Sequence, residues 1–226
     1  MFDITQPFNT QVEQAFYWQH QALSLEAFSR TGVVGTCGGL ALVTQAQWRQ
    51  PDLLLIDEMC HRHAGADAEP VTPASRLLAQ YGLMLVKTRP HQSGDDGAAA
   101  PYDFSHYQKA IMQQQLQWIA HWTQVLTQHA ASREVGEQHL LSLPSIRLRL
   151  ARVMQHQAWL QQGIADATHG DMPHWCSVYL SRLDNLLDDL IKTAGGRALL
   201  NHGLVQMQSL FTLINQLYLR TRHVPT

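Results

Sequence analysis

The sequence has few charged residues and no long apolar run, and each shortage excludes a class of protein. Asp, Glu, Lys and Arg make up only 15% of the 226 residues, and the formal net charge is −2. Such a chain does not attract nucleic acid through bulk charge. No apolar stretch approaches the roughly 20 residues that a membrane-spanning helix needs. Residues 1–30 contain Asp3, Glu13 and Glu26 and lack the apolar centre of a signal peptide, so none is expected.

Cysteine is also scarce. Cys37, Cys60 and Cys176 are widely spaced and odd in number, so they predict no disulfide framework and suit a reducing compartment. These observations favour a soluble, cytoplasmic protein. No His-Asp pattern accompanies Cys37 to make it a catalytic nucleophile. Apolar residues, by contrast, make up 45% of the chain, which is enough to bury a sizeable core.

Two local patterns resemble binding sites but have simpler explanations. Glu58, Cys60, His61 and His63 are potential metal ligands close together in the sequence. Neighbouring residues on a helix point about 100° apart, whereas ligands that converge on one ion recur at i and i+4. We therefore expect a helix end beside solvent and no metal site. The glycine-rich segment 35–39 lacks the ending and the preceding strand of a phosphate loop, which favours a turn between two helices.

The half of the chain after Pro101 has helical periodicity. Apolar residues recur at helical spacing over 104–126, 146–158, 179–191 and 204–219. Pro144 and Asp171 are predicted to begin the second and third helices, with Asp171 as an N-cap, and Gly195-Gly196 ends the third. Trp118, Trp122 and Trp159 are expected in the core or in a subunit interface. Four long amphipathic helices with short connections predict an up-down bundle over 102–226.

The first half is less regular. Apolar spacing predicts helices over 8–29 and 45–63, which would form an N-terminal helical lobe over 1–80. Only 82–88 has the composition of a strand. A single strand has no partner, so it is either a short stub or part of a helix from Ala74. Residues 89–101 are rich in Gly, Pro and Asp, so 81–101 is predicted as a strand stub and linker. The predicted fold class is all-α.

Several segments together resemble the acyl-CoA dehydrogenase family. Arg133-Glu-Val-Gly136, followed by the stretch 143–154, is similar to that family's Arg-x-x-Phe-Gly segment and the helix after it. Ala194-Gly195-Gly196 is similar to its His-Gly-Gly turn, and 204–217 to its final helix. Segments within 25–64 are similar to its earlier helical part. The resemblance covers about residues 20–80 and 102–220, and the order of the segments along the chain carries it.

The resemblance implies a loss of chemistry. Members of the family carry a flavin-binding β-domain between two helical parts, and 81–101 is too short to close a barrel, so that domain is expected to be absent. In the family a glutamate removes a proton from an acyl-CoA and the flavin accepts a hydride. The position that matches this glutamate is Leu219, which cannot accept a proton. A second placement in the family matches 113–117, which holds no carboxylate.

The resemblance also implies few flavin contacts. Arg133 matches an arginine that reaches the flavin diphosphate across a subunit interface, and Gly195 and Gly196 are weaker candidates. The other matching positions have lost the family's polar partners, namely Pro144, Gln206, Gln208 and Leu210. Bound FAD is therefore not expected.

Three functions remain open from the sequence. The first is a protein without dehydrogenase activity that acts as an assembly, regulatory or carrier-binding component. The apolar last helix predicts a homodimer or higher oligomer, and a full-length acyl-CoA dehydrogenase is a candidate partner. The second is an FAD-dependent oxidoreductase acting on the CH–CH group of acyl thioesters, completed by a partner subunit. The third is a helical ligand-binding protein with a cleft near Trp118 and Arg133.

Overall fold

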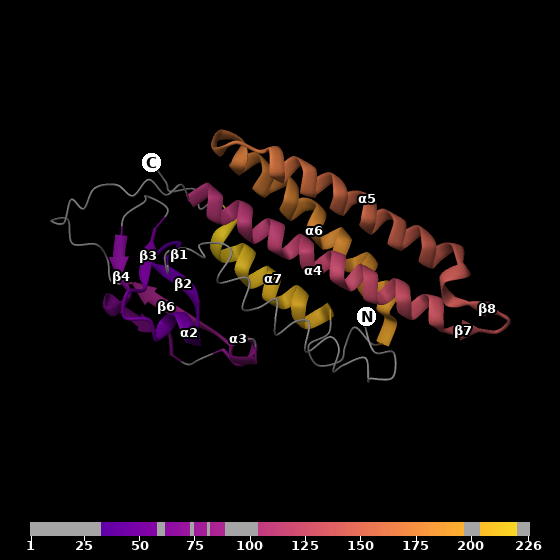
Figure 1. Ribbon diagram of the computed structural model, residues 1–226, viewed down its shortest axis with the longest axis horizontal. Helices are drawn as coiled ribbons and strands as arrows, with labels where there is room; N and C mark the ends of the chain where they lie inside the picture. Colours follow the sequence, from indigo (N-terminus) through magenta and orange to yellow (C-terminus); the bar gives the residue numbers. More distant parts are fainter. Residues whose placement is uncertain are drawn as a thin grey trace. The chain divides into compact units, whose positions relative to one another are not determined.

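Helices and short strands together form the described part of the chain. The computed structural model describes residues 33–57, 62–72, 75–80, 82–88, 104–196 and 204–220. These residues are mostly helical and divide into two compact units, 1–111 with 212–226 and 112–211. The helices α4 (Phe104–Ser132) and α7 (Leu204–Tyr218) each have residues in both units (Figure 1). The all-α prediction is therefore corrected to a mostly helical fold with strands.

Six strands of the first unit form two three-stranded sheets. In one sheet, β3 (Leu54–Ile56) lies between a parallel neighbour, β1 (Val33–Gly35), and an antiparallel one, β4 (Arg62–Ala64). In the other, β6 (Leu83–Thr88) lies between β2 (Leu40–Thr44) and β5 (Ala68–Pro70), both antiparallel to it. Both sheets contribute to a single core, made of Val34, Ala41, Val43, Leu53, Leu55, Ala68 and Val86. The short elements α2 (Gln45–Trp48), η1 (Gly65–Asp67) and α3 (Arg76–Gln80) connect strands.

The strand predicted over 82–88 is confirmed, but the prediction that it has no partner is wrong. Its partner β2 begins after a hairpin turn at Gly38 and Gly39, both at positive φ, where Cys37 and Leu40 exchange backbone hydrogen bonds of 2.9 and 3.1 Å. Two glycines in this position are typical of a tight β-hairpin. The turn thus joins strands rather than helices, and β-structure occupies much of the region predicted as a helical lobe.

The helix predicted over 45–63 is only four residues long, namely α2. Thr44 and Gln47 form a capping box, with Gln47 N donating to Thr44 Oγ1 at 3.1 Å and Thr44 N to Gln47 Oε1 at 2.9 Å. The helix stops at Trp48, and after a turn at Pro51 the chain continues as β3. The apolar run 53–56 is short and continuous, and periodicity alone cannot distinguish a buried strand from a buried helix in such a run. The helix predicted over 8–29 lies outside the described residues.

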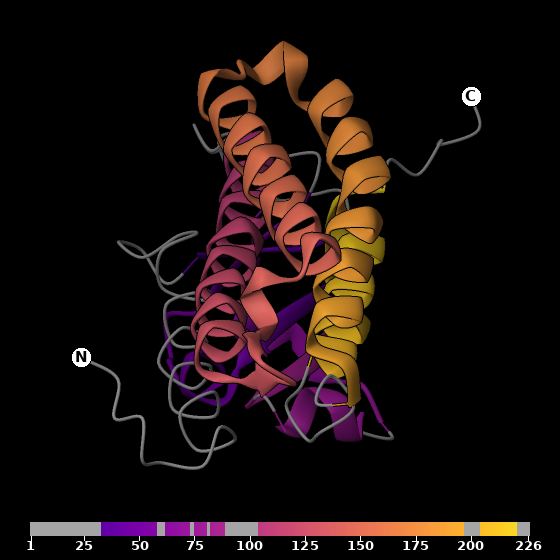
Figure 2. The same cartoon turned by 90° about the vertical axis from the view of Figure 1, so that its right-hand side faces the viewer.

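The four long helices of the second half are confirmed. Beside α4 and α7 these are α5 (Pro144–Asp166) and α6 (Met172–Ala194), which follow the hairpin β7 (Glu134–Val135) and β8 (Gln138–His139) and the turns η2 (Leu140–Ser142) and η3 (His169–Asp171). α5 and α6 run side by side as antiparallel neighbours (Figure 2). One side of α5 is buried through Ile146, Leu150, Val153, Leu160 and Ile164. None of the described helices is both long and apolar enough to cross a bilayer.

The end of α6 and its start can be compared with the capping residues predicted from the sequence. Gly195 ends α6 at φ 59°, as predicted, because glycine tolerates this conformation at little cost. Asp171 occupies the predicted N-cap position, but its carboxylate makes no bond to α6. Its Oδ2 instead accepts hydrogen bonds from the Thr168 hydroxyl at 2.6 Å and the Thr168 N–H at 3.2 Å. The acid therefore caps the turn before the helix and not the helix itself.

The final helix is buried along one broad face within the chain itself. Buried side chains recur along its whole length, namely Leu204, Met207, Leu210, Phe211, Ile214, Leu217 and Tyr218. A helix that is apolar on most sides needs cover, and here the chain supplies that cover without a second copy. The composition of α7 is therefore no longer a reason to expect a dimer.

Truncation to alanine should lower the stability of the protein by different amounts at two adjacent residues of β6. Val86 is fully buried in the core of the strands, whereas its neighbour Lys87 is exposed. Val86→Ala is expected to lower the free energy of unfolding by about 2 kcal/mol, and the control Lys87→Ala by less than about 0.5 kcal/mol. Urea denaturation measures both. Similar losses in the two variants would contradict the strand and its position at the centre of a sheet.

Candidate functional site

The position that the resemblance assigns to a catalytic glutamate is aliphatic and closed. Leu219 directly follows the end of α7, and only 1% of it is exposed. Its N–H donates to the carbonyl of Asn215 at 2.9 Å, so the backbone continues the hydrogen bonding of the helix. No proton acceptor is present on this side chain.

Two buried tyrosines of the first unit are in contact with each other, and one of them directly precedes Leu219 in the sequence. Tyr218 is the last residue of α7, and Tyr107 is in the first turn of α4. Their ring centroids are 4.9 Å apart in an edge-to-face arrangement, and the two phenols share a hydrogen bond. The phenol oxygen of Tyr218 also accepts the N–H of Leu42 at 2.8 Å, which attaches strand β2 to the end of α7.

Strand β1 packs directly on the same rings. A Cβ added at Gly35 would lie 2.6 Å from Cδ1 of Tyr107 and 3.2 Å from the ring of Phe104, so only glycine fits here. Gln108 Nε2 donates to the carbonyl of Tyr218 at 2.9 Å and joins the two helix ends. We call this set the tyrosine seam, made of Gly35, Leu42, Tyr107, Gln108 and Tyr218.

The seam contains no base that works near neutral pH. Burial raises the pKa of Tyr107 to about 12, and burial also raises the pKa of Tyr218 well above its ordinary value. Both phenols are therefore neutral under ordinary conditions, and a neutral phenol does not remove a proton from carbon. The seam can hold the strands to the helix ends, but it cannot perform the proton transfer that the resemblance implies.

These strands and helix ends are in direct contact at the tyrosine seam. The Leu42–Tyr218 hydrogen bond and the contact of Gly35 with Tyr107 leave no layer between them. The seam also offers no charged side chain for a phosphate or a polar ring edge. A flavin in this place would have to displace the contacts that join the strands to α4 and α7.

The three weaker cofactor candidates lie in the second unit and are exposed. Arg133 follows α4, and its carbonyl accepts the N–H of Leu140 at 2.7 Å across the β7–β8 hairpin. Gly195 and Gly196 follow α6. Arg149 Nη1 lies 3.5 Å from the carbonyl of Lys192, so the start of α5 and the end of α6 are adjacent. The hairpin and the glycine turn are thus at the same end of this unit.

The predicted cleft near Trp118 and Arg133 stays a prediction, and the two residues differ in their surroundings. Trp118 is buried and stacks on Phe211 with ring centroids 5.2 Å apart. Arg133 comes fifteen residues later, about 22 Å further along the direction of α4. Trp122 is also buried, in keeping with its predicted place in the core, whereas Trp159 is exposed on α5.

The residues that suggested a metal site are only partly described. Glu58, Cys60 and His61 lie outside the described residues. His63 is in strand β4 rather than a helix, and its Nε2 lies 3.2 Å from Oδ2 of Asp57. Within the described ranges no group of three or more His, Cys, Asp or Glu side chains is arranged to hold a metal ion.

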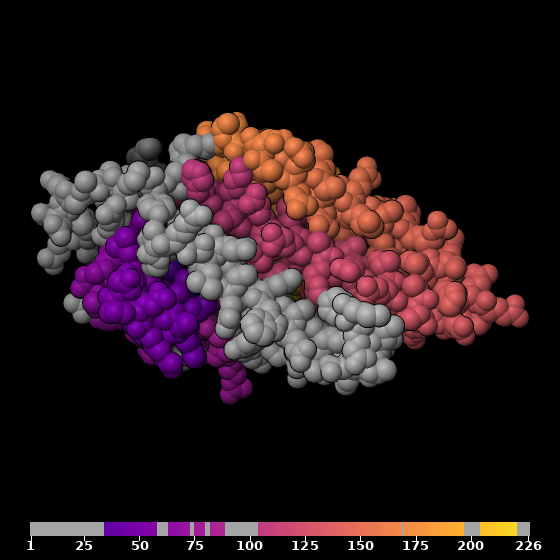
Figure 3. Space-filling model, viewed as in Figure 1, coloured from indigo at the N-terminus to yellow at the C-terminus, as the bar shows by residue number. Residues whose placement is uncertain are grey.

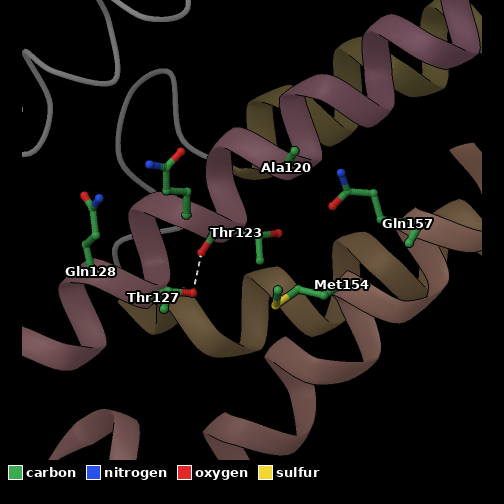
Figure 4. A pocket seen from close by; sticks show the side chains of 8 residues that line it. Ala120, Thr123, Thr127, Gln128, Met154 and Gln157 are labelled. Carbon is green, nitrogen blue, oxygen red and sulfur yellow. Dashed lines mark hydrogen bonds between the residues drawn. The ribbon is translucent and has the colours of Figure 1, made fainter. Parts of the chain in front are cut away.

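An open groove between α4 and α5 was not anticipated from the sequence. It has a volume of about 460 Å³ and is lined by Ala120, Thr123, Gln124, Thr127, Gln128, Met154, Gln157 and Ala158 (Figure 4). Thr123 and Thr127 donate their hydroxyl protons to carbonyls one turn earlier, each at 2.7 Å, so their methyl groups remain to line the groove. The lining holds no charge, which rules out recognition of an ionic ligand by a salt bridge there.

Comparison with known proteins relates this chain to solved structures by its fold. No family model and no curated protein matches the sequence. Solved structures match over most of the chain. FkbI, for biosynthesis of the methoxymalonyl extender unit of the polyketide immunosuppressant Fk520, has a TM-score of 0.56 and 10% identity over 90% of this chain and 76% of its own. The acyl-CoA dehydrogenase from Slackia heliotrinireducens has a TM-score of 0.56 and 10% identity over 92% and 71%.

The complex of ChsE4 and ChsE5 from Mycobacterium tuberculosis is similar as well, with a TM-score of 0.55 and 12% identity over 91% of this chain and 75% of that one. The chain has an acyl-CoA dehydrogenase-like fold. Identities this low relate the proteins by fold alone. The predicted resemblance is confirmed at that level. The expected loss of the family's β-domain is not confirmed, and most of the two sheets within 33–88 lies in the region predicted as a helical lobe.

Alkaline pH should destabilise the fold through the tyrosine seam. The pKa of Tyr107 is raised from 10.0 to about 12 by burial. Below pH 10.0 the folded and the unfolded chain both keep the proton, so this contribution to stability is complete. Between pH 10.0 and about 12 the unfolded chain loses the proton first, and about 3 kcal/mol is lost. Urea denaturation over this range measures the loss.

Tyr107→Phe is the control, because phenylalanine keeps the ring and removes the titrating group. Its stability should fall less steeply over the same pH range. Parallel losses in the two proteins would mean that other groups cause the alkaline destabilisation.

Proposed function

We propose that this chain is an acyl-CoA dehydrogenase-like protein without dehydrogenase activity of its own, which acts as an assembly or carrier-binding component. The observation that carries the proposal is the burial of Leu219 beside the tyrosine seam. Removal of the α-proton of an acyl thioester needs a base within reach of the substrate. The groups nearest to Leu219 in the sequence, Tyr218 and Arg220, do not act as bases at neutral pH.

The remaining architecture supports a scaffold. We take the four long helices α4 to α7 to form an antiparallel bundle over 102–226, with short connections between successive helices. The strands of the first unit are joined to helix ends by the protein's own side chains, so no cofactor is needed to complete that unit. The ChsE4–ChsE5 structure is a complex of two chains. By analogy, we propose that this chain pairs with another chain, either a second copy or a full-length acyl-CoA dehydrogenase.

The purified protein is expected to be colourless and inactive alone. After expression with added riboflavin and purification, its visible absorbance should lack the bands of an oxidised flavin, because the strands and helix ends are in direct contact at the seam. Acyl-CoA substrates should not reduce an electron-accepting dye in its presence. A matched preparation of an active acyl-CoA dehydrogenase is the positive control. A yellow protein whose colour is bleached by an acyl-CoA would overturn the proposal.

One observation keeps an oxidoreductase as a second candidate. Arg133 and the Gly195-Gly196 turn are exposed at one end of the second unit, where a partner chain could bring a flavin against them. An Arg guanidinium and open backbone at a helix end are suited to a diphosphate. This candidate predicts dye reduction only when a flavin-bearing partner is mixed with the chain. Arg133→Ala should then abolish the increase, whereas the first proposal predicts no increase at all.

A further inference from the structure

Exposed apolar side chains are concentrated in one short stretch of the described chain. The large apolar residues that are exposed are Val135 at 48%, Leu148 at 53%, Met154 at 59% and Trp159 at 48%. All of them belong to the β7–β8 hairpin or to α5. Side chains of this helix form part of the molecular surface at the upper right of Figure 3. Exposed apolar groups that gather on one element are typical of an interaction surface.

Two of these side chains share one row on α5. Leu148, Arg152, Gln155 and Trp159 follow one another at intervals of four, three and four residues and are all exposed. At about 100° per residue they lie within about 60° of one another, on the side of α5 that faces away from its buried residues. The row spans twelve residues, from Leu148 to Trp159, which is about 16 Å or three helical turns. We call it the α5 row.

The tryptophan of the row is held in place by α6. The guanidinium carbon of Arg182 lies 5.3 Å from the centre of the Trp159 ring, and the ring of Trp175 lies 5.5 Å away on the other helix. Gly163 makes room for this arrangement, since a Cβ there would lie 1.9 Å from the Trp175 ring. A fixed Trp beside an Arg loses little freedom on binding, and these two residue types dominate binding energy at interfaces.

The charge near the row is mainly positive. α5 contains Arg147, Arg149 and Arg152 and a single acidic residue, Asp166 at its last position, although the chain as a whole has a net charge of −2. Arg182 adds a further positive charge beside Trp159. Arginine presents a planar fork of donors that matches a carboxylate. The surface therefore combines apolar anchors with groups suited to acidic side chains.

We propose that the α5 row is the docking face for an acidic amphipathic helix of a partner protein. Leucine-type side chains of that helix contact Leu148 and Trp159, and its carboxylates bind Arg152 and Arg182. A second copy of the chain is disfavoured at this face, because two copies of α5, each with three arginines and one aspartate, would bring two helices of net positive charge together. A membrane surface is disfavoured because Met154 lies roughly 120° or more from Leu148 and Trp159 around the helix, so the apolar groups cannot enter a flat bilayer together. The proposal does not depend on whether the chain binds flavin.

A designed peptide tests this face directly. The probe is a fluorescently labelled, helical synthetic peptide with leucine on one face and glutamate on the other, and its binding is followed by fluorescence anisotropy. Arg152→Glu and Trp159→Ala are each expected to weaken binding about tenfold or more. The matched control is Arg147→Glu, which makes the same charge change on the same helix about 140° from Arg152. It should change binding by about twofold or less.

Several results would overturn the proposal. These are equal weakening by Arg147→Glu and Arg152→Glu, no binding of the glutamate peptide, or equal binding of a version with lysine in place of glutamate. Tighter binding to phosphatidylglycerol vesicles than to the peptide would assign the face to a membrane instead. Circular dichroism and urea denaturation of each variant confirm that it is folded. The flavin and dye measurements are independent of all these results, so failure here leaves the proposed lack of dehydrogenase activity untouched.

Discussion

The hydrogen bond from the Leu42 N–H to the Tyr218 phenol is the contact on which the first unit depends. It joins strand β2 to the last residue of α7, and the ring of Tyr107 fills the space beneath β1 where Gly35 has no side chain. The core that the strands share is made of a few small and medium-sized residues, so such a unit gains much of its stability from what it packs against. Leu219 follows Tyr218 directly and is buried as well.

The long helices could be predicted because their signals are local. Apolar residues repeat within one element, and Pro144 and Gly195 mark the ends of α5 and α6 directly. The strands could not be predicted in the same way, because a strand is defined by a partner that is distant in the sequence. The pairing of β2 with β6 joins residues that are about forty positions or more apart, from Thr44 with Leu83 to Leu40 with Lys87. Gly38-Gly39 between two apolar runs was nevertheless a hairpin signal that the helical interpretation overlooked.

Only part of the candidate site could be predicted from the sequence. The resemblance led to Leu219 and Arg133, since both lie in segments with recognisable order and spacing. The role of Tyr107 was hidden, because it depends on α4, α7 and two strands meeting in space. Trp159 was expected in the core or in an interface, and helical spacing could not decide between the two, since α5 has apolar residues on more than one side. Exposure is a tertiary property and had to be observed.

The partners of the Leu42–Tyr218 hydrogen bond are 176 residues apart in the sequence. At a typical rate of about 5–20 residues per second, a ribosome needs roughly 10–35 seconds to make the chain between them. Throughout that time strand β2 has no completed end of α7 to pack on. Until the end of α7 is made, the nascent strands have an open hydrogen-bonding edge that can pair with other chains. A chaperone that binds this edge would be most useful during that interval.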